Sequence, residues 1–144
     1  MENVTGHYGH TLEFSYNDNN QLTTLITPNS RVYIYAYDAN NNFLSVAYPN
    51  SPIKTYHYEN TNFPHHLTGI TSSNGVRFAT YAYSSNGLAI TTQHATTTNP
   101  TAQEKITFNY NSETKTTLTD AKGIQEVITF IEQHNSKKPI SKIN

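Results

Sequence analysis

The sequence predicts an all-β protein of tandem β-hairpins that form one twisted, curved antiparallel sheet. Three observations favour this fold class: an aromatic motif that recurs along the chain, turn-forming residues at short intervals, and a composition poor in aliphatic side chains. Only 35% of the 144 residues are hydrophobic and 13% are charged, yet there are eleven Tyr and six Phe. Thr and Tyr favour the half-buried surface of a pleated sheet, and Asn favours turns. We therefore expect strands whose apolar contacts come mainly from aromatic rings.

The recurring motif is an aromatic residue, any residue, and a tyrosine. Its final tyrosines stand 21, 21, 25 and 27 residues apart, and periods of this length are typical of repeat architectures. The five copies are Phe14-Ser15-Tyr16, Tyr35-Ala36-Tyr37, Tyr56-His57-Tyr58, Tyr81-Ala82-Tyr83 and Phe108-Asn109-Tyr110. Other positions keep the same step, since Leu22, Leu25 and Pro28 match Phe43, Val46 and Pro49 at a distance of 21.

The repeat divides the chain into three parts. We expect residues 1–8 to be an N-terminal lead-in and residues 9–130 to hold five to six repeats. The pattern fades after Phe130, so residues 131–144 are expected to form a frayed or truncated tail. The lysines of this tail, Lys137, Lys138 and Lys142, are interpreted as a solvated end.

Alternation of side chains predicts the strands within each repeat. Leu12, Phe14 and Tyr16 are expected on one face, with Glu13 and Ser15 on the other. The segment Arg31–Tyr37 differs, because Val32 and Ile34 alternate with its tyrosines, so this strand is predicted to be covered on both faces.

Two kinds of turn separate the strands, and both are rich in residues that accept positive φ or start a turn. The first kind follows the aromatic motif, at 17–20, 39–42 and 84–87. The second kind closes the repeat, at 27–30, 49–52, 72–75 and 120–123. Two longer intervals, 59–66 and 93–103, are predicted to be surface loops.

Composition and motifs exclude several classes of function. The net charge of −1 gives no basic patch for nucleic acid, and no apolar run is long enough for a transmembrane segment. No secretion signal is visible at the N-terminus, and Cys is absent. The seven His are scattered, and adjacent His65 and His66 would point to opposite faces of a strand, so we predict no metal site and no cofactor.

No catalytic signature is present either. The chain has no Gly-x-Ser-x-Gly elbow and no Gly-rich phosphate loop, and its acidic residues suggest no pair for glycoside cleavage. The protein is therefore predicted not to be an enzyme.

The motif resembles the YD repeat of the Rhs family. The closest matches are Tyr35-Ala36-Tyr37-Asp38, with Phe43, Val46 and Pro49 after it, and Thr119-Asp120-Ala121-Lys122-Gly123. The residues assigned to this repeat signature are Phe14, Tyr16, Tyr35, Tyr37, Asp38, Tyr56, Tyr58, Tyr81, Tyr83, Phe108, Tyr110, Asp120 and Gly123. The sequence departs from the family pattern where the Asp after Tyr is replaced, as at Asn17 and Glu59, and where the usual Gly is Asn41 or Ser30.

The resemblance implies a non-catalytic, structural role. Rhs proteins and insecticidal toxin complex subunits wind such hairpins into a hollow shell that encloses a C-terminal toxin. It thus implies a segment of a bacterial polymorphic toxin, secreted or at the cell surface, whose partners are the neighbouring repeats and the toxin domain of the parent chain. Six units are too few to close a shell, so we expect a fragment that self-associates through exposed edge strands. The segment Asp120-Ala121-Lys122-Gly123 lacks the Pro of the self-cleaving motif, so autoproteolysis is not expected.

Carbohydrate binding or cell-surface adhesion is the alternative function. Exposed tyrosine rings offer flat platforms to sugars, and Asn and Asp in the turns offer hydrogen bonds. The candidate ligand-binding residues are Tyr37, Asp38 and Tyr58. The sequence leaves open which face of the sheet meets solvent.

Overall fold

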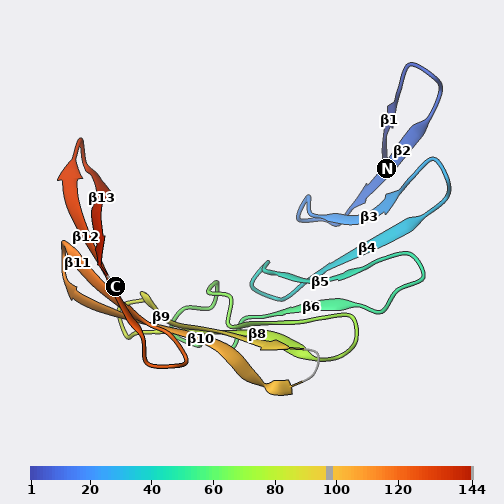
Figure 1. Ribbon diagram of the computed structural model, residues 1–144. Helices are drawn as coiled ribbons and strands as arrows, with labels where there is room; N and C mark the ends of the chain where they lie inside the picture. The colour runs from blue at the N-terminus through green and yellow to red at the C-terminus, as the bar shows by residue number, and fades with distance from the viewer. Residues whose placement is uncertain (97–98, 144) are drawn as a thin grey trace. The chain divides into compact units, whose positions relative to one another are not determined.

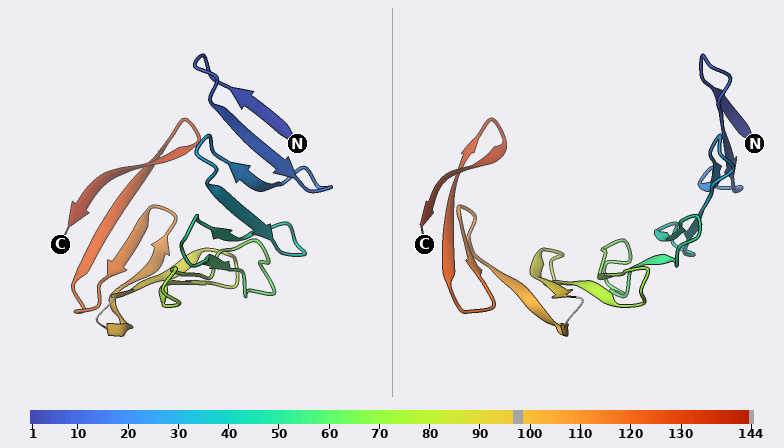
Figure 2. Two further views of the ribbon diagram at one scale, coloured as in Figure 1. Left: turned by 90° about the vertical axis from the view of Figure 1, so that its right-hand side faces the viewer. Right: turned by 45° about the vertical axis from the view of Figure 1, so that its right-hand side comes forward.

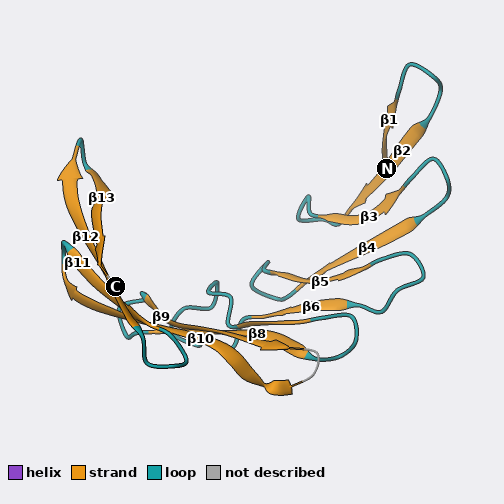
Figure 3. Cartoon of the chain, in the orientation of Figure 1, coloured by secondary structure: helices purple, strands orange, loops and turns teal. Residues whose placement is uncertain are grey.

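The computed structural model describes residues 1–96 and 99–143, and within them it contains thirteen β-strands and no helix (Figure 1, Figure 3). No helix of the described residues is long and apolar enough to cross a membrane. The chain divides into two compact units, Met1–Val76 and Arg77–Asn144. Each unit is a meander in which every strand pairs antiparallel with the next one along the chain. The predicted fold class, antiparallel tandem hairpins, is confirmed.

Unit 1 holds seven short strands. They are β1 (Glu2–Thr5), β2 (Thr11–Tyr16), β3 (Leu22–Ile26), β4 (Val32–Tyr37), β5 (Phe43–Ala47), β6 (Lys54–His57) and β7 (Gly69–Thr71). Successive strands are rotated against each other, as the right-handed twist of L-residue strands requires (Figure 2). The expected lead-in contains β1, which pairs in register with β2 from Glu2↔Phe14 to Thr5↔Thr11.

Unit 2 holds six strands, several of them longer. They are β8 (Arg77–Tyr83), β9 (Ala89–Thr96), β10 (Asn99–Ser112), β11 (Lys115–Thr119), β12 (Gln125–Gln133) and β13 (Ser136–Ile143). The loop predicted at 93–103 is wrong for the described residues, because 93–96 belong to β9 and 99–103 to β10, while Thr97 and Thr98 lie outside the described residues.

The end of the chain also differs from the expected frayed tail. Residues 131–133 complete β12, and β13 pairs with it from Gln133↔Ser136 to Val127↔Ile143. The two strands are joined by His134 and Asn135, which both have positive φ, as a type I′ hairpin turn requires. This turn lacks the Gly that usually marks such a hairpin, so its residue types indicate a turn only weakly.

Seven turns share one geometry. In the turn that begins at Asp38, the Asn41 N–H donates to the Asp38 carbonyl, and the Asp38 N–H donates to the Asn42 carbonyl, both at 3.0 Å. This pattern is a type I turn followed by a bulge residue with positive φ. The bulge residues are Gly9, Asn20, Ser30, Asn41, Gly75, Gly87 and Gly123. Asn and Ser therefore stand where the repeat usually has Gly, and they adopt the same left-handed conformation.

A second bulge recurs beside the repeat tyrosine. The register shifts between Ser15 and Tyr16, between Ala36 and Tyr37, and between Ala82 and Tyr83. In each case the following strand carries one extra residue, namely Thr23, Leu44 or Ile90. Bulges bend a strand and increase its twist. Nothing in the residue types marks these bulges, so the sequence does not predict them.

Little of the described chain is buried. Val46 in unit 1 and Ala79 in unit 2 are its only buried hydrophobic residues. The expectation that the β4 strand is covered on both faces is wrong, since Val32 is 41% exposed and Ile34 is 53% exposed. Both units are thus single-layered sheets without a covering layer of their own.

Candidate binding face

The repeat aromatic residues of unit 1 lie on one face of its sheet. Directly paired residues of antiparallel strands share a face, and so do alternate residues of one strand. Phe14 pairs with Leu25, which pairs with Tyr33, and Tyr35 pairs with Val46. The same argument adds the others, so that the aromatic face of unit 1 carries Phe14, Tyr16, Tyr35, Tyr37 and Tyr56.

Phe43 is the centre of this aromatic face. Its ring centroid lies 5.1 Å from that of Tyr56, 5.8 Å from that of Tyr37 and 6.1 Å from that of Tyr35, all in tilted arrangements. The Lys54 Nζ stands 5.5 Å from the Tyr56 centroid, in reach of a cation–π interaction. The repeat spacing predicts Phe43 as a repeat position, but it does not indicate that this residue joins three strands.

Unit 2 repeats this arrangement. Tyr81 pairs with Thr92, which pairs with Ile106, and Phe108 pairs with Leu118. The aromatic face of unit 2 therefore carries Tyr81, Tyr83, Phe108 and Tyr110. Burial raises the pKa of the Tyr83 phenol, as it does for Tyr35 and Tyr58 in unit 1.

Two repeat tyrosines tie their own strand to the one before it. The Tyr37 Oη donates to the Leu22 carbonyl at 3.0 Å, and the Tyr110 Oη donates to the Ala89 carbonyl at 2.7 Å. Leu22 and Ala89 both stand directly before a bulge residue, Thr23 or Ile90. In these two copies of the motif, the phenol of the last position reaches a carbonyl that lies directly beside a bulge.

The carboxylate of Asp38 is used within its own turn. Its Oδ1 accepts the N–H groups of Asn40 at 2.9 Å and Asn42 at 2.8 Å, and its Oδ2 accepts the Asn42 Nδ2 at 2.8 Å. The Asn42 side chain is the main cause that holds the pKa of Asp38 below its ordinary value. Asp120 accepts the equivalent N–H groups of Lys122 and Ile124.

Asn17 fills the same role without a charge. Its Oδ1 accepts the N–H groups of Asn19 at 3.1 Å and Gln21 at 2.9 Å. The turn thus needs a side-chain oxygen at this position rather than a negative charge. This explains how Asn can replace the usual Asp of the repeat.

The long loop after β6, predicted at 59–66, is confirmed and is fastened to the preceding turn by Asn42. This side chain is only 8% exposed. Its Nδ2 donates to the Pro64 carbonyl at 2.8 Å, and its Oδ1 lies 2.7 Å from the His65 Nδ1. Because both partners of Nδ2 are oxygens, Oδ1 must face His65, which then donates from Nδ1.

The three candidate ligand-binding residues are only partly available. The Tyr37 hydroxyl is hydrogen-bonded to a backbone carbonyl, and the Asp38 carboxylate is hydrogen-bonded within its own turn. Tyr58 follows β6 directly, and the negative charge of Asp38 adds to burial in raising its pKa. The structure thus places Asp38 and Tyr58 within electrostatic reach, but it leaves mainly ring surface to meet a ligand.

The histidines serve local contacts. His57 Nε2 lies 2.7 Å from the Thr71 Oγ1, and His66 stacks on Phe63 with centroids 4.8 Å apart. His65 and His66 lie in the loop rather than on a strand. No group of three or more His, Cys, Asp or Glu in the described part of the chain is placed to hold a metal ion.

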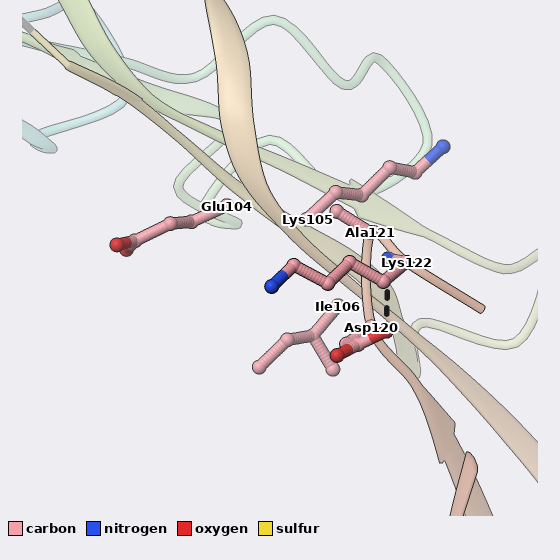
Figure 4. A pocket seen from close by; sticks show the side chains of 6 residues that line it. All are labelled: Glu104, Lys105, Ile106, Asp120, Ala121 and Lys122. Carbon is pink, nitrogen blue, oxygen red and sulfur yellow. Dashed lines mark hydrogen bonds between the residues drawn. The ribbon is translucent and has the colours of Figure 1, made fainter. Parts of the chain in front are cut away.

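A shallow hollow of about 320 Å³ lies between β10 and the turn after β11 (Figure 4). Its lining contains both acids and bases, namely Glu104, Asp120, Lys105 and Lys122. Lys105 points away from the other side chains (Figure 4). Asp120 is engaged by the Lys122 N–H at 2.9 Å. The hollow therefore offers no free pair of carboxylates.

The chain was compared with known proteins. A family model described as Teneurin YD-shell matches residues 1–130. The match covers all the repeat aromatic residues and ends within β12, so β13 lies beyond it. No curated protein matches the chain.

Proposed function

Because the chain belongs to the Teneurin YD-shell family, we propose that it is a non-catalytic wall segment of a bacterial polymorphic toxin, and that the wall encloses a toxin domain of the parent chain. The family supports the structural shell role itself. The enclosed toxin, the secreted or cell-surface location and the bacterial origin are parts of the proposal. The neighbouring repeats of the parent chain are its first partners.

The observation that carries the proposal is the single-layered sheet. A sheet stabilises a domain by burying one face against another layer. Here Val46 and Ala79 are the only buried hydrophobic residues of the described chain, while the repeat aromatic rings lie together on one face of each unit. A wall that faces an enclosed polypeptide gives these rings the layer that the units lack.

The use of the motif's polar atoms supports a structural rather than a catalytic role. A catalytic side chain needs a polar atom that is free to contact the substrate. The Tyr37 and Tyr110 hydroxyls donate to backbone carbonyls, and the Asp38 and Asp120 carboxylates accept turn N–H groups. The residues that define the repeat therefore hold the repeat together.

The test is site-specific photocrosslinking in the full-length parent protein. A benzophenone side chain replaces Tyr81, on the aromatic face of unit 2, or Thr80, which is exposed on the opposite face. We expect the Tyr81 variant to crosslink to the C-terminal part of the same chain and the Thr80 variant not to do so. Equal crosslinking from both faces, or none from Tyr81, would contradict the proposal.

Carbohydrate binding is the second candidate, and exposed rings favour it. Tyr16 is 43% exposed and Tyr110 is 42% exposed, which leaves room for a sugar to stack. A glycan array with the purified protein and a Tyr16→Ala variant tests it. Binding that the variant loses while it stays folded would support this function. Absence of binding by the unsubstituted 144-residue protein would reject it. Tyr37 is a poorer choice for this test, because its hydroxyl and ring also hold the repeat together.

A further inference from the structure

A hollow in unit 2 has features that the repeat motif does not explain. It measures about 420 Å³, in the range of pockets that hold small ligands. It lies between the turn after β8 and the strands β10 to β13. Its apolar lining comes from Leu88, Tyr110 and Phe130, and we call it the Tyr110–Phe130 pocket.

The apolar lining is held in place while remaining open to solvent. The Tyr110 ring is fixed by the hydrogen bond from its hydroxyl to the Ala89 carbonyl. The Leu88 N–H donates to the Ser84 Oγ at 3.1 Å, and the Phe130 N–H donates to the Thr114 carbonyl at 2.8 Å. Tyr110 and Leu88 are nevertheless 42% and 43% exposed. The Tyr110 ring and the backbone that carries Leu88 and Phe130 are thus already ordered, and groups ordered in advance lose little conformational entropy when a ligand binds.

Two opposite charges line the same pocket. Glu113 comes from the turn between β10 and β11, and Lys137 comes from β13. Within the part of the chain that the structure describes, neither side chain is in an ion pair. Ser112 and Thr116 add hydroxyl groups.

This combination selects the chemistry of a ligand. A simple anion would be attracted by Lys137 but repelled by Glu113. A simple cation would be attracted by Glu113 but repelled by Lys137. A neutral apolar molecule would gain no attraction from either charge. A ligand with both charges and an apolar body satisfies all parts of the lining at once.

We propose that the Tyr110–Phe130 pocket binds a zwitterionic apolar amino acid or dipeptide with both termini free. The side chains pack on Leu88, Tyr110 and Phe130, the ammonium group meets Glu113, and the carboxylate meets Lys137. The proposal goes beyond the role of the repeats as wall, because it depends on residues outside the aromatic motif, with the exception of Tyr110.

The test is an NMR titration of the ¹⁵N-labelled 144-residue protein with leucine and with the dipeptide leucyl-phenylalanine. We expect amide shifts confined to the strands and turns that line the pocket. The N-acetylated, C-amidated dipeptide has the same apolar surface without the charges, and we expect it to bind at least about tenfold more weakly.

Charge variants supply the second arm. Lys137→Met and Glu113→Gln are each expected to weaken binding of leucyl-phenylalanine at least about tenfold. Lys138→Met is the matched control, because Lys138 is the next residue on β13 and its Nζ donates to the Gln133 Oε1 at 3.1 Å instead of lining the pocket. Glu113, Lys137 and Lys138 are all exposed, so none of the three substitutions should disturb the fold. The dispersion of the NMR spectrum checks this for each variant.

Several outcomes would overturn the proposal. They are absence of binding at millimolar ligand, equal binding of the neutral derivative, an equal loss in Lys138→Met, or shifts spread over the aromatic face of unit 1. If binding is found and depends on both charges, the balance between leucine and the dipeptide identifies the size of the ligand.

Discussion

Single residues with positive φ control the turns of this protein. Gly123 has φ of 83°, and a Cβ built on it would meet nothing within 4 Å. Gly123→Ala should therefore cost only the backbone strain of an L-residue in this region, about 1 kcal/mol of unfolding free energy. Urea denaturation measures it. Gly6→Ala is the control, since Gly6 is not among the residues with positive φ and its added Cβ would make an ordinary 3.7 Å contact with the His10 carbonyl. Equal losses in both variants would contradict the assignment of strain to φ.

Asn42 is the residue whose replacement should cost most in unit 1. Its side chain contacts Asp38, Pro64 and His65, and it is almost fully buried. Asn42→Ala leaves these groups without their partner, and we expect a loss of about 2–3 kcal/mol of unfolding free energy. Thermal and urea unfolding measure the loss. Asn40→Ala, two residues away and exposed, should be close to neutral. If the two variants behave alike, the loop is not fastened through Asn42.

Acid should weaken the same turn through Asp38. The folded-state pKa of this carboxyl is lowered from 3.8, mainly by the hydrogen bond from the Asn42 side chain. A lowered folded pKa gives stability that is present above the unfolded value and is lost as the pH falls through the folded value. We therefore expect stability to decline below about pH 4, and Asp38→Asn to remove part of that decline. Urea midpoints of both proteins at pH 6 and pH 2.5 test this, and an unchanged pH dependence in the variant would contradict it.

At the scale of elements, the hydroxyls of two repeat tyrosines, Tyr37 and Tyr110, each join their strand to the one before it. Tyr37→Phe removes the hydroxyl bonded to the Leu22 carbonyl but keeps the ring beside Phe43. We expect a loss of about 1 kcal/mol of unfolding free energy, and the same for Tyr110→Phe. Tyr16→Phe is the control, because the described residues give its hydroxyl no partner. A loss in Tyr16→Phe as large as in the other two would mean that the bonded carbonyls are not what the phenols supply.

The sequence predicts the strands and turns well because each depends on residues close together in the chain. The turn at Asp38 follows from its own four or five residues, and the faces of the strands follow from alternation around Tyr35 and Tyr37. The aromatic face is predicted for the same reason. Only its centre, Phe43, was missed, because ring contacts across three strands depend on the register.

The features that could not be predicted depend on contacts far apart in the chain. Asn42 reaches Pro64, 22 residues away, and no local pattern distinguishes it from Asn40 or Asn41. The bulges at Thr23, Leu44 and Ile90 are set by the ladder rather than by residue type. The hairpin of β12 and β13 follows the end of the aromatic motif, and its strands pair through polar residues such as Glu132 and Lys137, so no pattern in the sequence distinguishes it from a frayed tail.

On the scale of the whole molecule, the described chain is stabilised by ladders and by contacts between neighbouring hairpins. Each hairpin rests on those beside it, as in other repeat proteins. Such a protein has little core to lose, so single ring truncations should act locally. The same construction leaves the outer strands of the sheets as the sites where further strands can add.

Self-association of the 144-residue protein is the prediction that belongs to this scale. The strand β13 carries Pro139 and three lysines, which discourage pairing, whereas β1 (Glu2–Thr5) carries neither Pro nor Lys. We therefore expect concentration-dependent dimers that form through β1, measured by light scattering coupled to size-exclusion chromatography. The Gly6 N–H donates to the His10 carbonyl, so by alternation the N–H groups of Val4 and Glu2 also face β2, and the N–H of Asn3 faces the free edge. Asn3→Pro removes a donor from that edge and should shift the protein to monomer, while Ile140→Pro on β13 should leave the dimer intact. A protein that stays monomeric at millimolar concentration would contradict the prediction, and a dimer broken only by Ile140→Pro would move the interface to β13.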